Sequence, residues 1–329
     1  MEGHNKGAVC VTGGTGFVAS WLIMKLLEQG YSVHATVRSS EPDKKKDISF
    51  LTNLPGATKR LQIFNADLYI PGSFDAAIAG CIGVFHVAFP MDFEDKETEE
   101  TKTKKAIDGT LSILKACLES KTVKRVVCTS SASTVFGQNK GLDVLDESTW
   151  TDVDFVRALK VVGTSYTIAK TSIERAALEF AEKHGLDLVT VIPPFIHGPF
   201  ICPRLPDSVR SSMAMIFGDK DQYNYLVNTT LAHVDDVASA HIFLLEHPDA
   251  KGRYICAAVE ITIQEMAKFL SSRYPEYQIP TADCLKEIRG IKFPGLSSKK
   301  LLDIGFKYKH GLEDMYDGAI QCCKQKGFL

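Results

Sequence analysis

The glycine-rich segment TGGTGFVAS, residues 12–20, constrains the fold of this chain more than any other part of the sequence. It follows an apolar run typical of a buried strand, and it opens a helical stretch that ends at Gly30. Gly13 permits a tight turn, and Gly16 lets the backbone approach a pyrophosphate, which the free N–H groups of a helix N-terminus attract. Ala19 stands where a third glycine is common, and its methyl group is tolerated in helix–strand packing. This context predicts a first βα unit that binds a dinucleotide.

Apolar runs and helical stretches alternate over the first two thirds of the chain. The runs with strand character cover residues 7–13, 31–38, 60–68, 83–89, 124–131 and 186–193. The helical stretches between them include residues 15–30, 97–120 and 165–185. Strands that are apolar on both faces and alternate with helices indicate an α/β fold with a doubly wound parallel sheet, a Rossmann fold.

This alternation breaks at about residue 195, where prolines cluster in PPFIHGPFICPRLP. We therefore expect residues 1–194 to form a dinucleotide-binding Rossmann domain that carries the catalytic residues. Residues 195–329 are expected to form mainly a smaller C-terminal substrate-binding lobe, with some segments returning to the Rossmann domain.

The composition argues against several classes of function. Of the 329 residues, 45% are hydrophobic and 24% are charged, and the formal net charge is −2, so nothing favours nucleic acid or a membrane as a partner. The nine cysteines include no CxxC pair, which argues against a zinc site or a redox motif, and we expect no metal. The N-terminus has no signal-peptide pattern, and no run reaches about 18 apolar residues. We expect a cytoplasmic protein that binds a small molecule.

The end of the second strand bears on the choice of cofactor. A site that prefers NAD usually has an acidic residue about 20 positions after the glycine loop, where it binds the ribose hydroxyls. Here Arg38 occupies that region, and Lys44, Lys45 and Lys46 follow. The planar guanidinium suits the 2′-phosphate of NADP, whereas a solvated loop explains the lysines equally well. We expect NADP(H) as the cofactor, with NAD(H) as the alternative.

Two further strand ends are expected beside the cofactor, because ligands of open α/β sheets bind beyond the carboxyl ends of the strands. Asp67 ends the third strand, and its carboxylate could accept a hydrogen bond from the adenine amino group. Val87 and Ala88 lie at the end of the fourth. His86 lies within that apolar strand, so we interpret it as a structural histidine rather than a catalytic one.

The segment GTSYTIAK, residues 163–170, holds Tyr166 and Lys170 one helical turn apart, so they share a face. Ser131 stands at the end of the fifth strand. This set suits carbonyl reduction, since the tyrosine hydroxyl donates a proton to the nascent alkoxide and the serine hydroxyl hydrogen-bonds the carbonyl oxygen. The lysine charge lowers the tyrosine pKa from its usual value of about 10. A nicotinamide would supply the hydride.

Together these residues resemble the extended branch of the short-chain dehydrogenase/reductase superfamily, over nearly the whole chain. Within it the chain is similar to the plant group that contains dihydroflavonol, anthocyanidin and vestitone reductases. The similarity rests on VCVTGGTGF, YSVHATVR, GVFHVAFPMDF, YTIAKT and PPFIHGPFICP, and the late segments, such as HVDDVASAH and GAIQCCKQKGFL, are nearest to vestitone reductases. The resemblance implies a monomer with Ser131, Tyr166 and Lys170 as the catalytic set. It also implies cofactor contacts at Gly13, Thr15, Gly16, Phe17, Arg38, Lys45, Asp67, Leu68, Val87, Ala88, Thr129, Tyr166, Lys170, Pro193 and Ser208.

Three positions depart from the pattern of this family. Ala19 replaces a frequent glycine, and Phe89 stands where a small threonine or serine usually precedes the proline. Phe136 falls where dihydroflavonol reductases commonly carry an asparagine that binds a flavonoid ring hydroxyl, and a phenylalanine cannot make that bond. We therefore do not expect a dihydroflavonol as the substrate. The KNWYCYGK motif of cinnamoyl-CoA reductases is also absent, which argues against a CoA thioester.

The expected substrate pocket is apolar and aromatic, with His197 as a polar anchor. Its candidate residues are Phe89, Pro90, Met91, Phe136, Phe195, His197, Met213, Met215 and Tyr223, and core packing is the alternative for each. Such a lining suits a fused-ring metabolite better than a nucleotide sugar. The resulting hypothesis is an NADP(H)-dependent oxidoreductase that reduces a carbonyl of a polycyclic plant specialised metabolite, isoflavanone-like or alkaloid-like.

Three alternatives remain. The same residues serve oxidation, as in the lactol-to-lactone dehydrogenases of alkaloid pathways such as noscapine synthase. A non-catalytic NADP-sensing binding protein would usually have lost the tyrosine or the lysine, and a sugar-nucleotide epimerase would need a more polar pocket. The sequence alone leaves open the substrate and the direction of the reaction.

Overall fold

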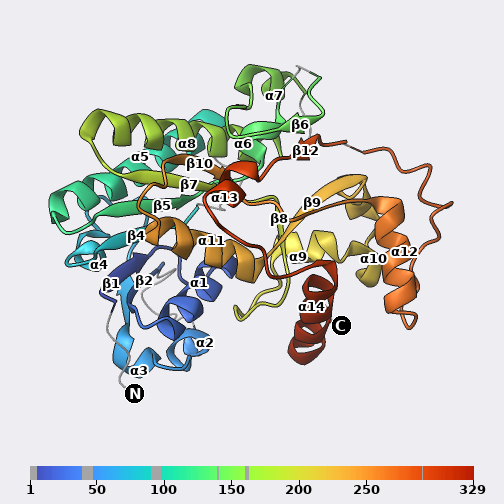
Figure 1. The fold of residues 1–329 in the computed structure, drawn as a ribbon, viewed down its shortest axis with the longest axis horizontal. Helices are drawn as coiled ribbons and strands as arrows, with labels where there is room; N and C mark the ends of the chain where they lie inside the picture. Colours follow the sequence, from blue (N-terminus) through green and yellow to red (C-terminus); the bar gives the residue numbers. More distant parts are fainter. Residues whose placement is uncertain (1–5, 39–46, 90–97, 139–140, 160–162, 291) are drawn as a thin grey trace.

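The computed structural model describes residues 6–38, 47–89, 98–138, 141–159, 163–290 and 292–329. Its centre is a seven-stranded sheet in the order β10-β7-β5-β4-β1-β2-β3, in which all neighbouring strands are parallel (Figure 1). The strands are β1 (Ala8–Val11), β2 (Ser32–Val37), β3 (Leu61–Asn65), β4 (Gly83–His86), β5 (Arg125–Thr129), β7 (Leu188–Ile192) and β10 (Gly252–Ile255). The strand order reverses at β1, which pairs with β2 on one side and with β4 on the other. The predicted doubly wound parallel sheet is therefore confirmed.

Helices cover both faces of this sheet, and side chains that alternate along each strand give each face its own core. Val9 and Val11 belong to the core of one face, to which Ala19 also contributes, and Cys10 belongs to the core of the other. The helices that contribute to the first core are α1 (Phe17–Glu28), α2 (Ser49–Thr52), α3 (Ala57–Arg60), α11 (Val234–Glu246) and α13 (Lys299–Asp303). Those that contribute to the second are α4 (Asp75–Ile78), α5 (Glu99–Ser120) and α8 (Thr164–His184).

A second, smaller lobe lies beside the central sheet, at the right of Figure 1. It contains a three-stranded sheet in the order β11-β9-β8, formed by β8 (Phe195–His197), β9 (Asn228–His233) and β11 (Val259–Thr262). Its helices are α9 (Asp207–Ser212), α10 (Ala214–Phe217), the 3₁₀ helix η1 (Lys220–Tyr225), α12 (Ile263–Arg273) and α14 (Leu312–Lys326). Because β10, α11 and α13 return to the central sheet, the chain crosses between the two parts more than once.

A small parallel pair of strands lies at the top of Figure 1. It joins β6 (Val144–Leu145) to β12 (Gly295–Leu296), and the neighbouring helices are α6 (Ser133–Phe136) and α7 (Val153–Leu159). The division of the chain at residues 194 and 195 stays a prediction.

Helix α8 matters most for the site, since it carries Tyr166 and Lys170. It begins after Gly163 and ends at Gly185, whose φ angles of 88° and 67° lie in the left-handed region that glycine adopts without strain. These two glycines set its bounds, which agree with the predicted helix over 165–185 to within one residue.

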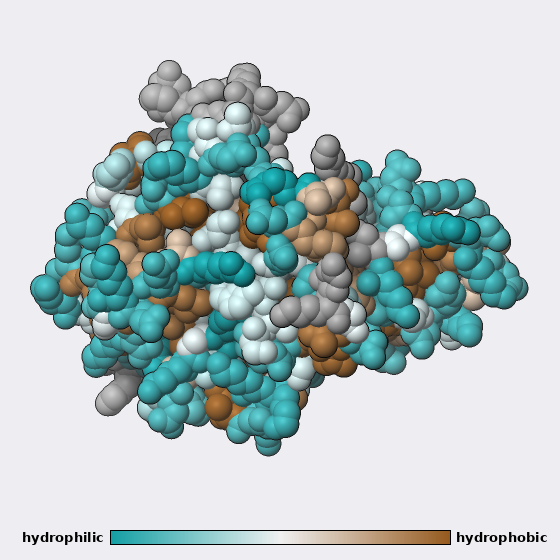
Figure 2. Space-filling view, turned by 90° about the horizontal axis from the view of Figure 1, so that it is seen from above, coloured by the Kyte–Doolittle hydropathy of each residue, from teal (hydrophilic) through white to brown (hydrophobic). Residues whose placement is uncertain are grey.

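The face of the molecule shown in Figure 2 is mostly hydrophilic, with small apolar patches between the polar side chains. Within the described ranges, no helix combines the length and the apolar character that a membrane span requires. All nine cysteines are free thiols, and all but Cys284 are buried. Most of them therefore serve as small apolar side chains in the cores.

Candidate active site

The expected catalytic hydroxyls meet where the end of β5 lies against α8. Ser131 follows β5 by two residues, and Tyr166 lies in the first turn of α8. Burial raises the pKa of Tyr166, and the nearby Ser131 hydroxyl opposes this rise. The two hydroxyls are adjacent, as carbonyl reduction requires.

Lys170 lies one turn after Tyr166 on the inner face of α8, and only 8% of its surface is exposed. Its Nζ donates a hydrogen bond to the carbonyl oxygen of Thr129, at 3.2 Å. Burial lowers the pKa of Lys170 to about 8, although Glu174 and Cys128 act in the opposite direction. The ammonium is thus charged at neutral pH but is held by few polar partners.

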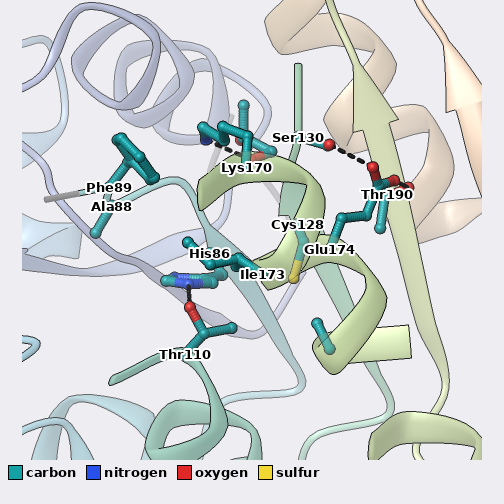
Figure 3. Close-up of a pocket in the computed structure, with 12 residues that line it drawn as sticks. His86, Ala88, Phe89, Thr110, Cys128, Ser130, Lys170, Ile173, Glu174 and Thr190 are labelled. Carbon is teal, nitrogen blue, oxygen red and sulfur yellow. Dashed lines mark hydrogen bonds between the residues drawn. The ribbon is translucent and has the colours of Figure 1, made fainter. Parts of the chain in front are cut away.

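Phe89, three residues after β4, lies near Lys170, and both side chains are labelled in Figure 3. The Lys170 ammonium lies 4.3 Å from the centroid of its ring, within the range of a cation–π contact. The Phe89 ring also meets the ring of Tyr166 edge-on, with centroids 5.4 Å apart and an interplanar angle of 79°. This departure from the family pattern therefore touches two of the three expected catalytic residues.

The end of β4 is fixed by hydrogen bonds that the sequence does not reveal. The Thr12 hydroxyl accepts from the backbone N–H groups of Val87 and Ala88, both at 3.0 Å. His86 is bonded through one ring nitrogen to Thr12 and through the other to Thr110, each at 3.1 Å. Burial, followed by the nearby charge of Lys170, lowers the pKa of His86 to about 3. His86 is a neutral histidine whose bonds hold the strand in place.

The glycine loop is shaped to receive a phosphate. Gly13 has a φ of 71°, and a Cβ there would come within 3.0 Å of the Ala88 Cα. The first turn of α1 contains no acidic residue, and no side chain among the described residues caps its N-terminus at Gly16. Thr15 and Phe17 flank this position. The helix N-terminus without a side-chain cap and the tight backbone approach fit the pyrophosphate of a dinucleotide.

The structure also locates the residues expected at the adenosine half of the cofactor. Arg38 follows β2 directly and is exposed, as a 2′-phosphate ligand must be. Lys45 lies outside the described residues. Asp67 follows β3 by two residues, and its Oδ1 accepts from the backbone N–H of Tyr69 at 2.9 Å, which shapes the turn that contains Leu68. Whether these residues bind the cofactor stays a prediction.

Three expected cofactor contacts already have partners within the protein. The Thr129 hydroxyl is hydrogen-bonded to Nε2 of His241 at 2.8 Å. The Ser208 hydroxyl donates to the carbonyl oxygen of Ile196 at 2.7 Å, and the carbonyl oxygen of Pro193 accepts from the backbone N–H of Ala132 at 2.9 Å. These groups support the loops around the site, and their contact with the cofactor stays a prediction.

The residues predicted to line the substrate pocket do not lie together but in several different parts of the structure. Phe89 contacts Tyr166 and Lys170, and Pro90 and Met91 lie outside the described residues. The Phe136 ring packs on Phe293 with centroids 4.6 Å apart, and Phe195 is half-buried. The other four are enclosed in the core of the second lobe, each with 4% or less of its surface exposed: His197, Met213, Met215 and Tyr223. Contact between these four and a substrate would require the second lobe to rearrange.

His197, the expected polar anchor, lies at the end of β8 with 0% of its surface exposed. Its ring meets Tyr316 with centroids 4.5 Å apart, and neither ring nitrogen has a hydrogen-bond partner among the described residues. Burial and then the neighbouring His233 lower its pKa to about 3. A neutral, enclosed imidazole is what the structure provides here, and its contact with a substrate stays a prediction.

Sequence reasoning missed a buried polar group behind the expected catalytic residues. Glu174 forms an ion pair with Arg253 at 3.1 Å, and their side chains are 2% and 6% exposed. Glu174 also accepts a hydrogen bond from Ser130. A signal was present, because Glu174 stands four residues after Lys170 and so shares its helix face.

Comparison with known proteins identifies the family of this chain. Residues 9–257 match the model of the NAD-dependent epimerase/dehydratase family. The chain belongs to that family. The predicted place in the extended branch of the short-chain dehydrogenase/reductases is confirmed. This member of the family is an NAD(P)-dependent oxidoreductase.

Several plant proteins resemble this family member over nearly their whole length. It is 55% identical to vestitone reductase of Medicago sativa, over 99% of each chain. It is 54% identical to the protein BRI1-5 ENHANCED 1 of Arabidopsis thaliana, over 98% of this chain and 90% of the relative. It is 47% identical to dihydroflavonol 4-reductase of Callistephus chinensis, over 100% of this chain and 90% of that one.

The fold agrees with these sequence relations. The crystal structure of vestitone reductase from alfalfa superimposes with a TM-score of 0.91 at 53% identity, covering 98% of this chain and 100% of that one. A yeast reductase, Gre2, solved in complex with NADPH, gives a TM-score of 0.79 at 24% identity, over 98% of this chain and 100% of that one. The second likeness concerns the fold alone.

Proposed function

We propose that this protein is an NADP(H)-dependent reductase of a ketone on a polycyclic plant metabolite, with an isoflavanone-like compound as the first candidate. The carrying observation is the placement of the Ser131 hydroxyl beside Tyr166, with Lys170 one turn away in the same buried site. The relatives named as vestitone, dihydroflavonol and anthocyanidin reductases support the substrate class. An alkaloid-like carbonyl is the second candidate.

The residues have distinct roles in the proposed reduction. Bound NADPH supplies the hydride that reduces the carbonyl carbon. Ser131 donates a hydrogen bond to the carbonyl oxygen, and Tyr166 donates the proton that this oxygen takes up. The positive charge of Lys170 favours the tyrosinate that remains. Gly13 and Gly16 would hold the pyrophosphate.

Selection between NADPH and NADH is assigned to Arg38. A guanidinium at the end of β2 favours a 2′-phosphate and offers nothing comparable to a free ribose hydroxyl. Fluorescence titration should therefore give tighter binding of NADPH than of NADH. Equal or tighter NADH binding would move the oxidation of a lactol or alcohol to first place, since the same three residues serve that direction.

The decisive test of the proposal is Tyr166→Phe. We expect a loss of turnover of about a hundredfold or more, because the proton donor is removed. Dissociation constants for NADPH should stay close to those of the unmodified protein. Turnover is followed as NADPH oxidation with an isoflavanone, a dihydroflavonol and simpler aryl ketones.

Tyr277→Phe is the matched control, because the Tyr277 hydroxyl is buried and has no hydrogen-bond partner among the described residues. It should keep full activity. Turnover retained in Tyr166→Phe would refute the assignment. No turnover of any ketone by the unmodified protein, together with binding of a uridine nucleotide sugar, would favour an epimerase.

A further inference from the structure

The carboxylate of Glu174 is enclosed directly behind the catalytic residues. Glu174 lies on α8 one turn after Lys170 and two turns after Tyr166, with 4% of its surface exposed. It accepts hydrogen bonds from the hydroxyls of Ser130, at 2.7 Å, and Thr190, at 2.6 Å. These two donors come from neighbouring strands of the central sheet, β5 and β7, so one carboxylate ties both strands to the helix.

Arg253 holds this carboxylate from the edge strand β10. Its Nε donates to Glu174 at 3.1 Å, and its Nη1 donates to the carbonyl oxygens of Glu147, at 2.8 Å, and Thr149, at 2.7 Å. The guanidinium also stacks over Trp150, 3.5 Å from the ring centroid. A guanidinium fixed at this many points leaves the Glu174 carboxylate little freedom to move.

Ser130 is the point at which this buried group reaches the catalytic residues. It stands between Thr129, whose carbonyl accepts from Lys170 at 3.2 Å, and Ser131, whose hydroxyl lies beside Tyr166. The bond from Ser130 to Glu174 therefore links the strand end to α8 between the two contacts on which the proposed chemistry depends.

We propose that Glu174 is a positioning residue, which acts through Ser130 to hold the end of β5 in register with α8. The inference rests on the proposed function, since it assumes that Ser131, Tyr166 and Lys170 act on the carbonyl. Misplacement of reacting groups by about 1 Å can cost up to about a hundredfold in rate, so a bond at this position affects turnover more than binding.

The Glu174 carboxylate also affects the charge of Lys170, which lines the same small cavity. Glu174 and Lys170 both line a cavity of about 30 Å³, room enough for a single water (Figure 3). The titratable groups around Lys170 are His86 of β4, Cys128 of β5, and Tyr166 and Glu174 of α8. Among them Glu174 is the main group that raises the pKa of Lys170 against the effect of burial. Its loss should therefore discharge Lys170 at a lower pH.

The test compares Ser130→Ala with Thr190→Val. Each variant removes one hydroxyl that donates to the same carboxylate, so both should lower the melting temperature to a similar extent. Ser130→Ala should lower kcat about tenfold while the KM for the ketone and the Kd for NADPH change less than about twofold. Thr190→Val, whose strand carries no catalytic residue, should keep kcat within about twofold.

Equal kcat values in the two variants would overturn the inference, because the bond would then serve stability alone. Glu174→Gln adds a pH profile, in which the fall of kcat at alkaline pH should move to lower pH, while Ser130→Ala should leave it in place. An unshifted profile in a folded Glu174→Gln protein counts against the electrostatic effect. If this variant does not fold, the serine and threonine pair still decides.

Tyr166→Phe separates this inference from the proposed function. Turnover retained in Tyr166→Phe refutes the proposed function itself. An inactive Tyr166→Phe together with unchanged kcat in Ser130→Ala refutes only the positioning role of Glu174.

Discussion

Two lysines of this protein lie in polar clusters that are built in opposite ways. Lys170, in the candidate active site, makes one hydrogen bond within the described residues, to a backbone carbonyl, and otherwise faces the Phe89 ring. Lys25, on α1, donates to both carboxylate oxygens of Asp235, at 2.6 and 2.8 Å. Both lysines are mostly buried, but only Lys25 has a full counter-charge in contact.

The cluster around Lys25 is saturated with partners. Asp235 also accepts from the indole N–H of Trp21, and its backbone N–H donates to Nδ1 of His233 at 3.0 Å. Burial raises the pKa of Asp235, but the bonds from Lys25 and Trp21 outweigh it and hold the pKa below its usual value. His310 stacks on His233 with ring centroids 4.1 Å apart.

The same cluster contains the ligand types that a metal prefers, within a span of 4.8 Å: Asp235, Asp236 and His310. The carboxylate of Asp236 accepts from the backbone N–H groups of Lys309 and His310, at 3.0 and 3.1 Å. With both carboxylates engaged in this way, the cluster acts as a joint between α1, α11 and the segment before α14. From this contrast we infer that a buried charged side chain is a candidate for catalysis where it has few hydrogen-bond partners.

The largest difference between the two clusters should appear when each lysine is replaced by methionine. Lys170→Met removes the charge that favours the tyrosinate, so turnover should fall about a hundredfold or more. Its free energy of unfolding should change little, because the variant replaces a poorly paired buried charge with an apolar side chain. Steady-state kinetics and urea denaturation measure the two quantities.

Lys25→Met provides the comparison. It should keep full turnover and lower the free energy of unfolding, since it leaves the half-buried Asp235 without its main partner. An active Lys170→Met protein, or an inactive but stable Lys25→Met protein, would contradict this division of roles.

Most of the fold could be predicted from the sequence, because its signals are local. The proposed catalytic set rests on local signals too, and its role stays a prediction. The glycine loop, the apolar strands and the spacing of Tyr166 and Lys170 each depend on residues close together in the chain. The sequence predicted that segments after residue 195 return to the Rossmann domain, but it did not locate the seventh strand, β10. The four residues Gly252–Ile255 carry no signal stronger than that of many other short runs. Its place beside β7 depends on packing.

The substrate pocket shows where local signals fail. Met213 and Tyr223 have the apolar and aromatic character of a pocket lining, but the same character suits the core of the second lobe, where both are enclosed. Glu174 was missed for the opposite reason. A glutamate on a helix is usually exposed, and the partners that make its burial tolerable lie elsewhere in the chain, with Arg253 on a strand 79 residues away.

A smaller but more specific difference concerns pH. The pKa of Lys170 is about 8, lowered by burial, so its charge should be lost as the pH rises through that value. Reductive turnover should therefore fall above about pH 8, by up to about tenfold per pH unit, if the charge is required. Profiles of kcat against pH measure this effect, and an activity that stays constant to pH 10 would exclude a role for the charge.

The free energy of unfolding should rise over the pH range in which Lys170 loses its proton and turnover falls. In the unfolded chain the lysine keeps its proton up to about pH 10.4, so between about pH 8 and that value the unfolded state binds more protons. The contribution of Lys170 to the free energy of unfolding therefore rises with pH in this window. The difference in that free energy between the unmodified protein and Lys170→Met isolates the effect, and a difference independent of pH would contradict it.

The smallest expected effect is the coupling between Lys25 and Asp235. A double-mutant cycle with Lys25→Met and Asp235→Asn should give about 1 kcal/mol, because both side chains are only 15% exposed and the Asn amide oxygen still accepts from Trp21. The matched pair is Lys104 and Asp108, whose side chains are 75% and 59% exposed at a similar distance of 2.6 Å. That pair should give less than about 0.5 kcal/mol, since water screens it. Equal coupling energies in the two pairs would mean that burial does not strengthen the ion pair between Lys25 and Asp235. The contrast between Lys25 and Lys170 would then depend only on the effect of Lys170 on turnover.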